Sequence, residues 1–277
     1  MDLNERLNKV KEREKRITEN MSKIKYKIAV LSGKGGVGKT TISVNLAVGL
    51  MEEGFLVGLL DLDLHGPNIV RMLGIKENPT IENSLIKPPT YLKNMKVMSM
   101  AMLLEESQPL AWRGPMKHSV IQQFLADTDW GELDFLIFDL PPGTGDEALS
   151  LFQLVKMDGI VLVTTPQKVA IDDVSRAMNF AIEMNQKVLG LIINMSYLIC
   201  PQCKTKIDLF GENAAKDFAE LVGIDVLGEI PMDPAIAKLA DAGKPVVSFL
   251  RGSEVEKSFR AVIGTMLEKL GKVSTGG

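Results

Sequence analysis

Residues 33–40 read Gly33-Lys34-Gly35-Gly36-Val37-Gly38-Lys39-Thr40. The stretch matches the pattern G-x-x-x-x-G-K-[ST], and it lies between an apolar β-rich run and an amphipathic helical stretch, which is the context the pattern requires. Glycines let the backbone wrap with its N–H groups pointing inward, where they can hold phosphate oxygens. Lys39 is placed to reach the β- and γ-phosphates of a nucleotide, and the Thr40 hydroxyl to ligate Mg²⁺. We therefore expect a nucleotide site here, with Thr41 included, rather than a glycine-rich turn without a ligand.

Seven short apolar runs alternate with helical stretches along the chain. Each run is nearly continuous in Val, Ile, Leu, Phe and Met, which is typical of strands buried on both faces of a parallel sheet. This alternation predicts an α/β fold with a doubly wound, mostly parallel sheet and helices on both faces. Ligands in such folds bind at the carboxyl ends of the strands. The runs are Lys27–Ser32, Phe55–Asp61, Lys96–Ala101, Phe135–Leu140, Gly159–Thr165, Val188–Met195 and Val226–Ile230.

The N-terminal 27 residues differ from the rest of the chain because they hold nine Lys/Arg and five Asp/Glu. We expect residues 1–27 to form a charged helical arm and residues 28–277 a single domain. The arm is predicted either to lie on the body as a solvated helix or to dock on a partner subunit. The polar, proline-containing residues 76–95 are predicted to be a surface excursion, and the amphipathic residues 255–270 a final helix packed on the core. The apolar residues of the arm near helical spacing are Leu3, Leu7, Val10, Ile17 and Met21.

Composition narrows the class of protein. The chain has 277 residues, is 45% apolar and 24% charged, and carries a net charge of −3, which excludes a largely disordered chain and argues against a protein that coats nucleic acid. No apolar run approaches the roughly 18 residues of a membrane span, and residues 1–27 lack the apolar core of a secretory signal. The two cysteines are too few for a secreted disulfide framework, so we expect a cytoplasmic protein that acts without membrane or nucleic acid.

Carboxylates end two of the predicted strands. Asp61 and Asp63 lie two residues apart at the end of one strand, so they point to the same face, where they suit Mg²⁺ and water handling beside a phosphate loop. A solvated strand end is the alternative interpretation. Asp139 ends the apolar run Phe135–Leu140 in a Walker B arrangement and is expected to hold a water on Mg²⁺. Together with the phosphate loop, Asp139 predicts an ATPase.

The two cysteines form one local pair, Cys200-Pro201-Gln202-Cys203. A tetrahedral metal site or a [4Fe–4S] cluster needs four ligands, and the chain has no other cysteine and only His65 and His118. A symmetric dimer would bring the same motif twice to one axis and supply four thiolates. A redox pair, two inert surface thiols or a zinc site shared by a dimer remain as alternatives, since thiolates suit zinc and iron–sulfur clusters alike.

Four segments in this order resemble the Mrp/ApbC family of iron–sulfur cluster carrier ATPases over roughly residues 25–270. They are the phosphate loop with its second lysine, the Asp-Leu-Asp-Leu-His-Gly-Pro-Asn segment from Asp61 to Asn68, the Asp-Leu-Pro-Pro-Gly-Thr-Gly-Asp segment from Asp139 to Asp146, and the C-P-x-C pair. The early lysine also resembles the deviant loops of the nitrogenase iron protein and of MinD and ParA. The chain departs from relatives that carry an N-terminal four-cysteine module or a small acidic domain, because residues 1–27 contain neither.

The resemblance implies roles for individual residues. Lys34 would act across a nucleotide-sandwich homodimer on the partner's phosphates, and Asp63 would position the attacking water. Asp61 would orient the Mg²⁺ shell, and Gly143 would sense the γ-phosphate through its N–H group. The resemblance further implies an adenine-binding segment made of Asn194, Pro231 and Asp233, which favours ATP over GTP.

The function implied is that of an ATP-dependent carrier. A homodimer would bind a [4Fe–4S] cluster between its cysteine pairs, transfer it to apo iron–sulfur proteins and hydrolyse ATP slowly, as a switch does. The alternatives are a MinD-like or ParA-like ATPase acting on membrane or DNA, with structural zinc at the cysteine pair, and a metabolic ATPase that tolerates loss of both cysteines.

Overall fold

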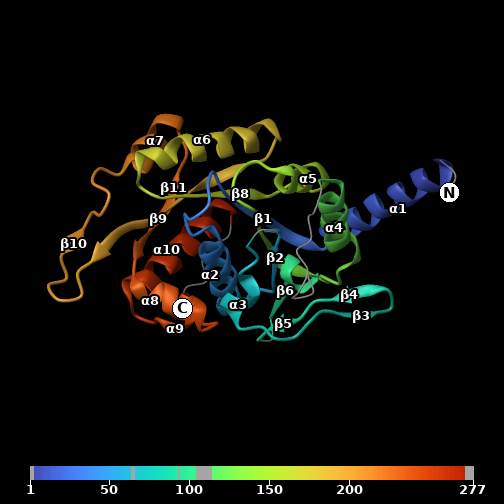
Figure 1. The fold of residues 1–277 in the computed structure, drawn as a ribbon, viewed down its shortest axis with the longest axis horizontal. Helices are drawn as coiled ribbons and strands as arrows, with labels where there is room; N and C mark the ends of the chain where they lie inside the picture. The colour runs from blue at the N-terminus through green and yellow to red at the C-terminus, as the bar shows by residue number, and fades with distance from the viewer. Residues whose placement is uncertain (1–2, 64–65, 93, 104–113, 272–277) are drawn as a thin grey trace.

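The computed structural model describes residues 3–63, 66–92, 94–103 and 114–271. A central sheet divides two layers of helices, in agreement with the predicted doubly wound α/β fold (Figure 1). The strands run in the order β10-β9-β8-β1-β7-β2-β6-β5, and β11 pairs with β9. Strands β1, β2, β6, β7, β8, β9 and β11 are parallel to their neighbours in this group, while β5 and β10 are antiparallel edge strands.

All seven predicted strands are present, with small shifts at their ends. They are β1 (Ile24–Ser32), β2 (Val57–Asp61), β6 (Met95–Ser99), β7 (Leu133–Asp139), β8 (Gly159–Thr164), β9 (Val188–Ile199) and β11 (Val226–Met232). Short strands that the apolar pattern did not indicate are β3 (Thr80–Glu82), β4 (Leu85–Lys87), β5 (Thr90–Tyr91) and β10 (Lys206–Ile207).

The continuous apolar strands are explained by two cores. In β1, Ile28 and Val30 pack into one hydrophobic cluster and Ala29 and Leu31 into the other, so both faces of the strand are buried. One face of the sheet is covered by α1 (Leu3–Ser22), α4 (Gly114–Asp127), α5 (Asp146–Leu154), α6 (Lys168–Glu183) and α7 (Ala214–Val222). The other is covered by α2 (Lys39–Glu52), α3 (Ile69–Leu73), α8 (Pro234–Asp241), α9 (Val246–Phe249) and α10 (Glu254–Lys269), and the 3-10 turn η1 (Met100–Leu103) follows β6.

Helix α1 projects from the body, and its C-terminal part is anchored on α4 (Figure 1). Ile17 and Met21 are buried, and the Asn20 amide donates to the carbonyls of Leu125 and Ala126 on α4. The next strand begins at Ile24, so the last four residues of the predicted arm belong to it, because Ile24 is apolar and enters the same core. Residues 1 and 2 of that arm lie outside the described residues.

The final helix packs on the core as predicted. The apolar face of α10 is fully covered, and the polar Ser253 caps its first turn by accepting a hydrogen bond from the Glu256 amide. Each large apolar side chain buried in this way contributes roughly 1.5–3 kcal/mol. None of the described helices combines the length and apolar character needed to cross a bilayer. The buried residues are Val255, Phe259, Val262, Ile263, Met266 and Leu267.

Candidate nucleotide site and cysteine hairpin

The phosphate loop turns between the end of β1 at Ser32 and the start of α2 at Lys39. Two glycines are required by its backbone, because Gly36 and Gly38 have φ of 80° and 82°, in the left-handed region. Gly33 is required for space: a Cβ atom there would lie 2.0 Å from the backbone carbon of Asp173 on α6. The loop is therefore pressed against α6 and has the shape of an anion cradle at a helix N-terminus.

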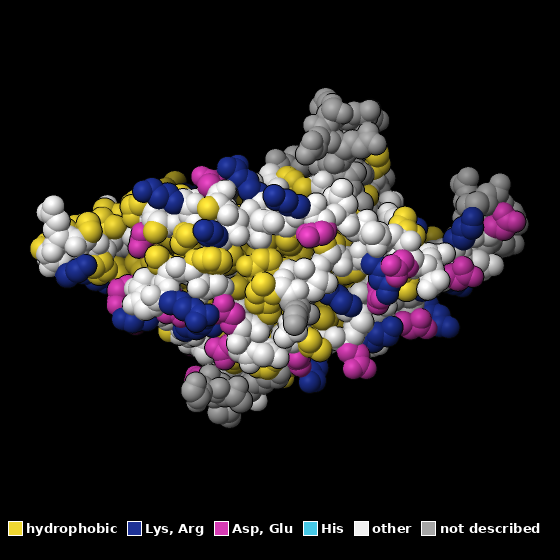
Figure 2. Space-filling view, turned by 90° about the horizontal axis from the view of Figure 1, so that it is seen from below, with side chains coloured by type: hydrophobic (Ala, Val, Ile, Leu, Met, Phe, Trp, Pro, Cys, Tyr) yellow, Lys and Arg dark blue, Asp and Glu magenta, His cyan; other side chains and the backbone are white. Residues whose placement is uncertain are grey.

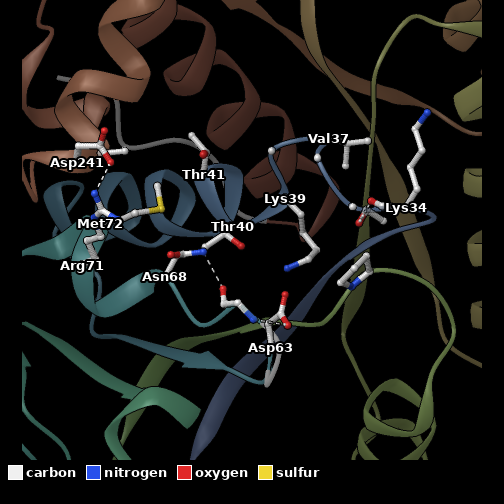
Figure 3. Close-up of a pocket in the computed structure, with 17 residues that line it drawn as sticks. Lys34, Val37, Lys39, Thr40, Thr41, Asp63, Asn68, Arg71, Met72 and Asp241 are labelled. Atoms are coloured by element: carbon white, nitrogen blue, oxygen red, sulfur yellow. Dashed lines mark hydrogen bonds and ion pairs between the residues drawn. The ribbon is translucent and has the colours of Figure 1, made fainter. Parts of the chain in front are cut away.

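A pocket of about 380 Å³ opens over this loop (Figure 3). The floor of the pocket is formed by the loop residues Lys34, Gly35, Gly36, Val37, Gly38, Lys39, Thr40 and Thr41. Figure 3 shows the Lys34 side chain directed away from the Lys39 amino group, so the two lysines of the loop point in different directions. Asn68, from the segment singled out in the sequence, lies at the outer rim. The rest of the rim was not indicated by the sequence patterns, and it consists of Arg71, Met72, Ala240 and Asp241.

Asp139 accepts hydrogen bonds from three side chains of α2. Its Oδ1 accepts from the Lys39 ammonium and the Ser43 hydroxyl, each at 2.6 Å, and its Oδ2 accepts from the Thr40 hydroxyl at 2.8 Å. Asp139, Lys39 and Ser43 are buried. Ser43 was missed by the sequence analysis, although it lies one helical turn beyond Lys39 and Thr40 and so shares their face. The predicted role of Lys39 on phosphates requires it to exchange its bond to Asp139 for one to a nucleotide.

Asp61 lies beside Asp139 at the carboxyl edge of the sheet. The two residues are register partners on β2 and β7, and both are fully buried. Burial, and next the charge of Asp139, raise the pKa of Asp61 from 3.8 to about 8. Ser99, its register partner on β6, donates to Asp61 Oδ2 at 2.9 Å, and the Asp63 amide donates to Oδ1 at 3.0 Å. At neutral pH the protonated form of Asp61 predominates in this arrangement.

Replacement of Asp61 by asparagine is expected to change how stability depends on pH. Between about pH 4 and pH 8 the folded protein keeps a proton on Asp61 that the unfolded chain has lost, so the free energy of unfolding falls as pH rises, by up to about 1.4 kcal/mol per pH unit. The amide introduced by Asp61→Asn does not titrate, so the stability of this variant should depend less on pH in this window. Urea unfolding in EDTA at pH 5, 6, 7 and 8 measures both slopes, and equal slopes would contradict this assignment of the proton.

Residues of the two family-like segments, which begin at Asp61 and at Asp139, line adjoining cavities. Asp63 lines the nucleotide pocket and also an adjoining cavity of about 550 Å³, whose wall includes Pro142, Lys117 and Glu147. Lys117 on α4 and Glu147 on α5 form an ion pair there at 2.6 Å. Asp63 Oδ1 accepts from the Gly66 amide at 3.3 Å, and His65 lies outside the described residues.

Gly143 is engaged within the protein. Its N–H group donates to the Ser32 carbonyl at 2.8 Å, and its φ of 86° requires glycine. A role for this amide as a γ-phosphate sensor therefore requires the bond to Ser32 to be exchanged, and it stays a prediction.

The residues predicted to read adenine lie outside the pocket lining. Asn194 is buried behind the loop, and its side-chain amide donates to the Val37 carbonyl at 2.8 Å. Asp233 caps α8 by accepting from the Ala235 amide at 2.8 Å, and Pro231 is buried in β11. Base recognition by these three residues stays a prediction, and the structure adds a contact between Asn194 and the loop itself.

The cysteine pair occupies the tip of a hairpin that extends from the sheet (Figure 1). Strand β9 ends at Ile199, β10 returns antiparallel from Lys206, and the Cys200 amide donates to the Thr205 carbonyl at 3.0 Å. Cys200 is partly exposed, Cys203 is exposed, and both are free thiols. Among the described residues no group of three or more His, Cys, Asp and Glu could hold a metal ion.

Thr205 is a second residue that the sequence analysis missed. Its hydroxyl lies 3.2 Å from the Cys203 sulfur, and this hydrogen bond, more than any other contact, lowers the pKa of Cys203 from 9.0 to about 7. A hydroxyl two residues after a cysteine is a weak signal in sequence. It gains meaning only because the hairpin turns both residues to one side.

We predict that Thr205→Val slows alkylation of Cys203. Without the hydroxyl the thiol pKa should rise toward its ordinary value, so the thiolate that reacts at pH 7 is depleted and the rate falls roughly tenfold or more. Alkylation with iodoacetamide, followed for each cysteine by peptide mass spectrometry across pH 6–10, measures this. An unchanged pH profile for Cys203 would show that Thr205 does not stabilise its thiolate.

A known protein family matches most of the chain. Residues 23–267 match the ParA family described as NUBPL iron-transfer P-loop NTPase. The chain belongs to this family. It is 44% identical over 275 residues to the iron–sulfur cluster carrier protein of Pyrococcus horikoshii, covering 95% of this chain and 93% of that protein.

Two solved structures are similar to this chain. A nucleotide-binding protein from Archaeoglobus fulgidus, in complex with ADP and with Co found by PIXE, is 37% identical and superposes with a TM-score of 0.75, covering 87% of this chain and 98% of that chain. The septum site-determining protein MinD of Pyrococcus horikoshii, complexed with Mg-ADP, is 23% identical with a TM-score of 0.64, covering 87% of this chain and 95% of that chain. The second likeness concerns the fold alone.

Proposed function

We propose that this P-loop NTPase is an ATP-dependent iron–sulfur cluster carrier. Two copies would hold one [4Fe–4S] cluster between their cysteine hairpins and deliver it to apo-proteins, with slow ATP hydrolysis acting as a switch. The observation that carries the proposal is the pair of free thiols, one partly and one fully exposed, at the tip of a hairpin whose strand also borders the phosphate loop. The names of the relatives, which include iron–sulfur cluster carrier proteins, support the same conclusion.

The nucleotide half of the proposal uses the loop and the buried carboxylates. Backbone N–H groups of Gly33–Thr41 and the Lys39 ammonium would bind the phosphates of ATP. Thr40, Asp61 and Asp139 offer the oxygen ligands that Mg²⁺ prefers, and a divalent cation beside them would favour the ionised form of Asp61. The bound Mg²⁺ would neutralise charge on the phosphates. Asp63, at the edge of both cavities, would position the attacking water.

A homodimer is needed for both halves of the proposal. Lys34 points away from its own loop lysine (Figure 3), as expected for a residue that acts on the nucleotide of a facing subunit. The hairpin of one chain supplies two thiolates, whereas a [4Fe–4S] cluster takes four cysteine ligands. A second copy supplies the other pair by symmetry. Because the cargo is held by reduced thiols, we place the protein in a reducing compartment, the cytoplasm.

The alternatives of membrane and DNA binding draw less support from the structure. The apolar face of α10, the segment considered for a membrane anchor, is buried in the core. On the face in Figure 2, Lys and Arg side chains are interspersed with Asp and Glu, and the described surface there carries no continuous basic stripe. Structural zinc at the cysteine hairpins remains the main competitor for the metal.

A transfer assay tests the proposal. The anaerobically reconstituted protein is mixed with an apo-dehydratase whose activity needs a [4Fe–4S] cluster, with ATP, with ADP or without nucleotide. We expect activation of the apo-dehydratase at a rate that depends on ATP and that exceeds the rate from free iron and sulfide in the presence of a chelator. Activation no faster than from the free ions would contradict a carrier function.

A further inference from the structure

Strand β9 connects the phosphate loop to the cysteine hairpin. Near its middle, the Asn194 side-chain amide donates to the Val37 carbonyl at 2.8 Å, and both residues are buried. The contact is tight, because a Cβ atom on Gly38 would lie 2.2 Å from the Asn194 amide nitrogen. A shift of the Val37–Gly38 turn must therefore be met by a shift of Asn194. Only residues 195–199, the remainder of the same strand, separate Asn194 from Cys200.

The pairing of β9 with β11 changes directly after Asn194. Ile230 pairs with Asn194, but the next pair is Met232 with Leu198, so four steps on β9 match two on β11. The extra residues form a bulge, and within it Met195 has φ of 55°, a left-handed conformation that a non-glycine side chain rarely adopts. Pro231 lies opposite and has no N–H group to fix the register. The pairing of β9 with β11 is therefore irregular in the stretch between the Asn194–Val37 contact and the cysteine hairpin.

One residue after Met195, and still within the bulge, β9 is tied to the body by a polar cluster. Ser196 donates to Glu229 on β11, the Asn213 amide donates to both at 3.2 and 3.1 Å, and Lys216 on α7 pairs with Glu229 at 2.6 Å. The cluster gives the cysteine hairpin a defined pivot at the bulge. The tip beyond the pivot carries Cys200, whose amide donates to the Thr205 carbonyl and whose carbonyl accepts from the Lys204 amide.

We propose that Asn194 is a positioning residue that couples the nucleotide at the phosphate loop to the cysteine hairpin, with the bulge at Met195 as the flexible joint. The inference rests on the proposed function for the nucleotide at the loop and for the thiols at the hairpin. Nucleotide binding reorganises the Val37–Gly38 turn, and Asn194 moves with this turn. The bulge transmits the movement to the cysteine hairpin, which turns about the Ser196–Glu229 contact. This path runs through one strand and does not need the segments around Asp63 and Gly143.

Hydrogen exchange with and without saturating MgADP tests this coupling in the cluster-free protein. Peptides covering residues 33–41 report nucleotide binding, and peptides covering residues 198–206 report the hairpin. In the unmodified protein we expect MgADP to protect the loop and to change hairpin exchange at least about fivefold, the lower end of ordinary coupling between sites. Because Asn194 is also predicted to contact adenine, MgADP is raised until the loop of Asn194→Ala is protected as strongly as in the unmodified protein. At this matched occupancy the hairpin response of Asn194→Ala should disappear.

Two further variants make the test decisive. Met195→Gly removes the left-handed constraint but keeps the Asn194 contact, and we expect it to weaken the hairpin response. Asn8→Ala, which replaces an exposed asparagine on α1 far from the loop, is the matched control and should retain the full response. A full hairpin response in Asn194→Ala, or no response in the unmodified protein while its loop is protected, would overturn the coupling. Absence of loop protection by MgADP in the unmodified protein would instead overturn the nucleotide site of the proposed function, and the coupling with it.

Discussion

Cys200→Ser and Cys203→Ser are each expected to reduce the iron and sulfide retained after anaerobic reconstitution by at least about tenfold, since each variant leaves a symmetric dimer with two cysteine ligands where a [4Fe–4S] cluster needs four. Nucleotide binding should be unchanged, because the hairpin tip does not line the nucleotide pocket. Iron and sulfide assays after gel filtration, with MgADP binding measured calorimetrically on the same samples, check both expectations.

The hairpin offers its own control for the cysteine variants. Gln202 lies between the two cysteines and is exposed, so Gln202→Ser introduces the same residue into the same turn without removing a thiol. It should retain the full amount of iron and sulfide. Iron retention by either cysteine variant at the level of Gln202→Ser would show that the cluster is held elsewhere.

The second large effect concerns Lys34. We expect Lys34→Ala and Asp63→Ala to lose most of their ATPase activity, Lys34→Ala because a cation supplied across an interface to the transferring phosphate is worth about 10³-fold or more, and Asp63→Ala because it lacks the carboxylate that positions water. Both variants should still bind MgADP through the intact loop from Gly35 to Thr40. The phosphate released in a steady-state assay gives the loss.

Mixing the two inactive variants separates action across the interface from action within one chain. If Lys34 serves the partner's nucleotide, a mixed dimer has one complete site, with Asp63 from one chain and Lys34 from the other. Random exchange makes half of the dimers mixed, so about a quarter of the unmodified activity should return. If the mixture stays inactive although native mass spectrometry detects mixed dimers, Lys34 does not act in trans.

Periodicity and motif context were sufficient for the fold because buried parallel strands have a strong local signature. Each of the seven apolar runs is a strand, since a run such as Lys27–Ser32 contributes side chains to both cores. The short strands β3, β5 and β10 escaped because a strand of two or three residues has too little pattern to separate it from a turn. The start of β1 at Ile24 was misjudged because Lys25 and Lys27 continue the charge of the arm while already lying in the strand.

The site was predictable where a motif fixes both chemistry and position. Lys39, Thr40 and Asp139 do come together, since a strand–loop–helix motif and a neighbouring strand end must meet at one edge of the sheet. Ser43, Ser99 and Thr205 were not singled out, because a hydroxyl acquires its role from a partner supplied by another element or by the turn of the chain. The contact of Asn194 with Val37 was equally beyond sequence, as it joins residues 157 positions apart.

Anaerobic native mass spectrometry of the reconstituted protein, with iron, sulfide and zinc assayed on the same sample, tests the central claim most directly. A cluster bridging two hairpins predicts that metal is found on the dimer, with about four irons and four sulfides per two chains. Gentle chelation should remove the iron and return the cluster-free mass. A cluster on the monomer, zinc alone at the hairpins, or a dimer without metal would contradict a cluster held between two copies of this chain.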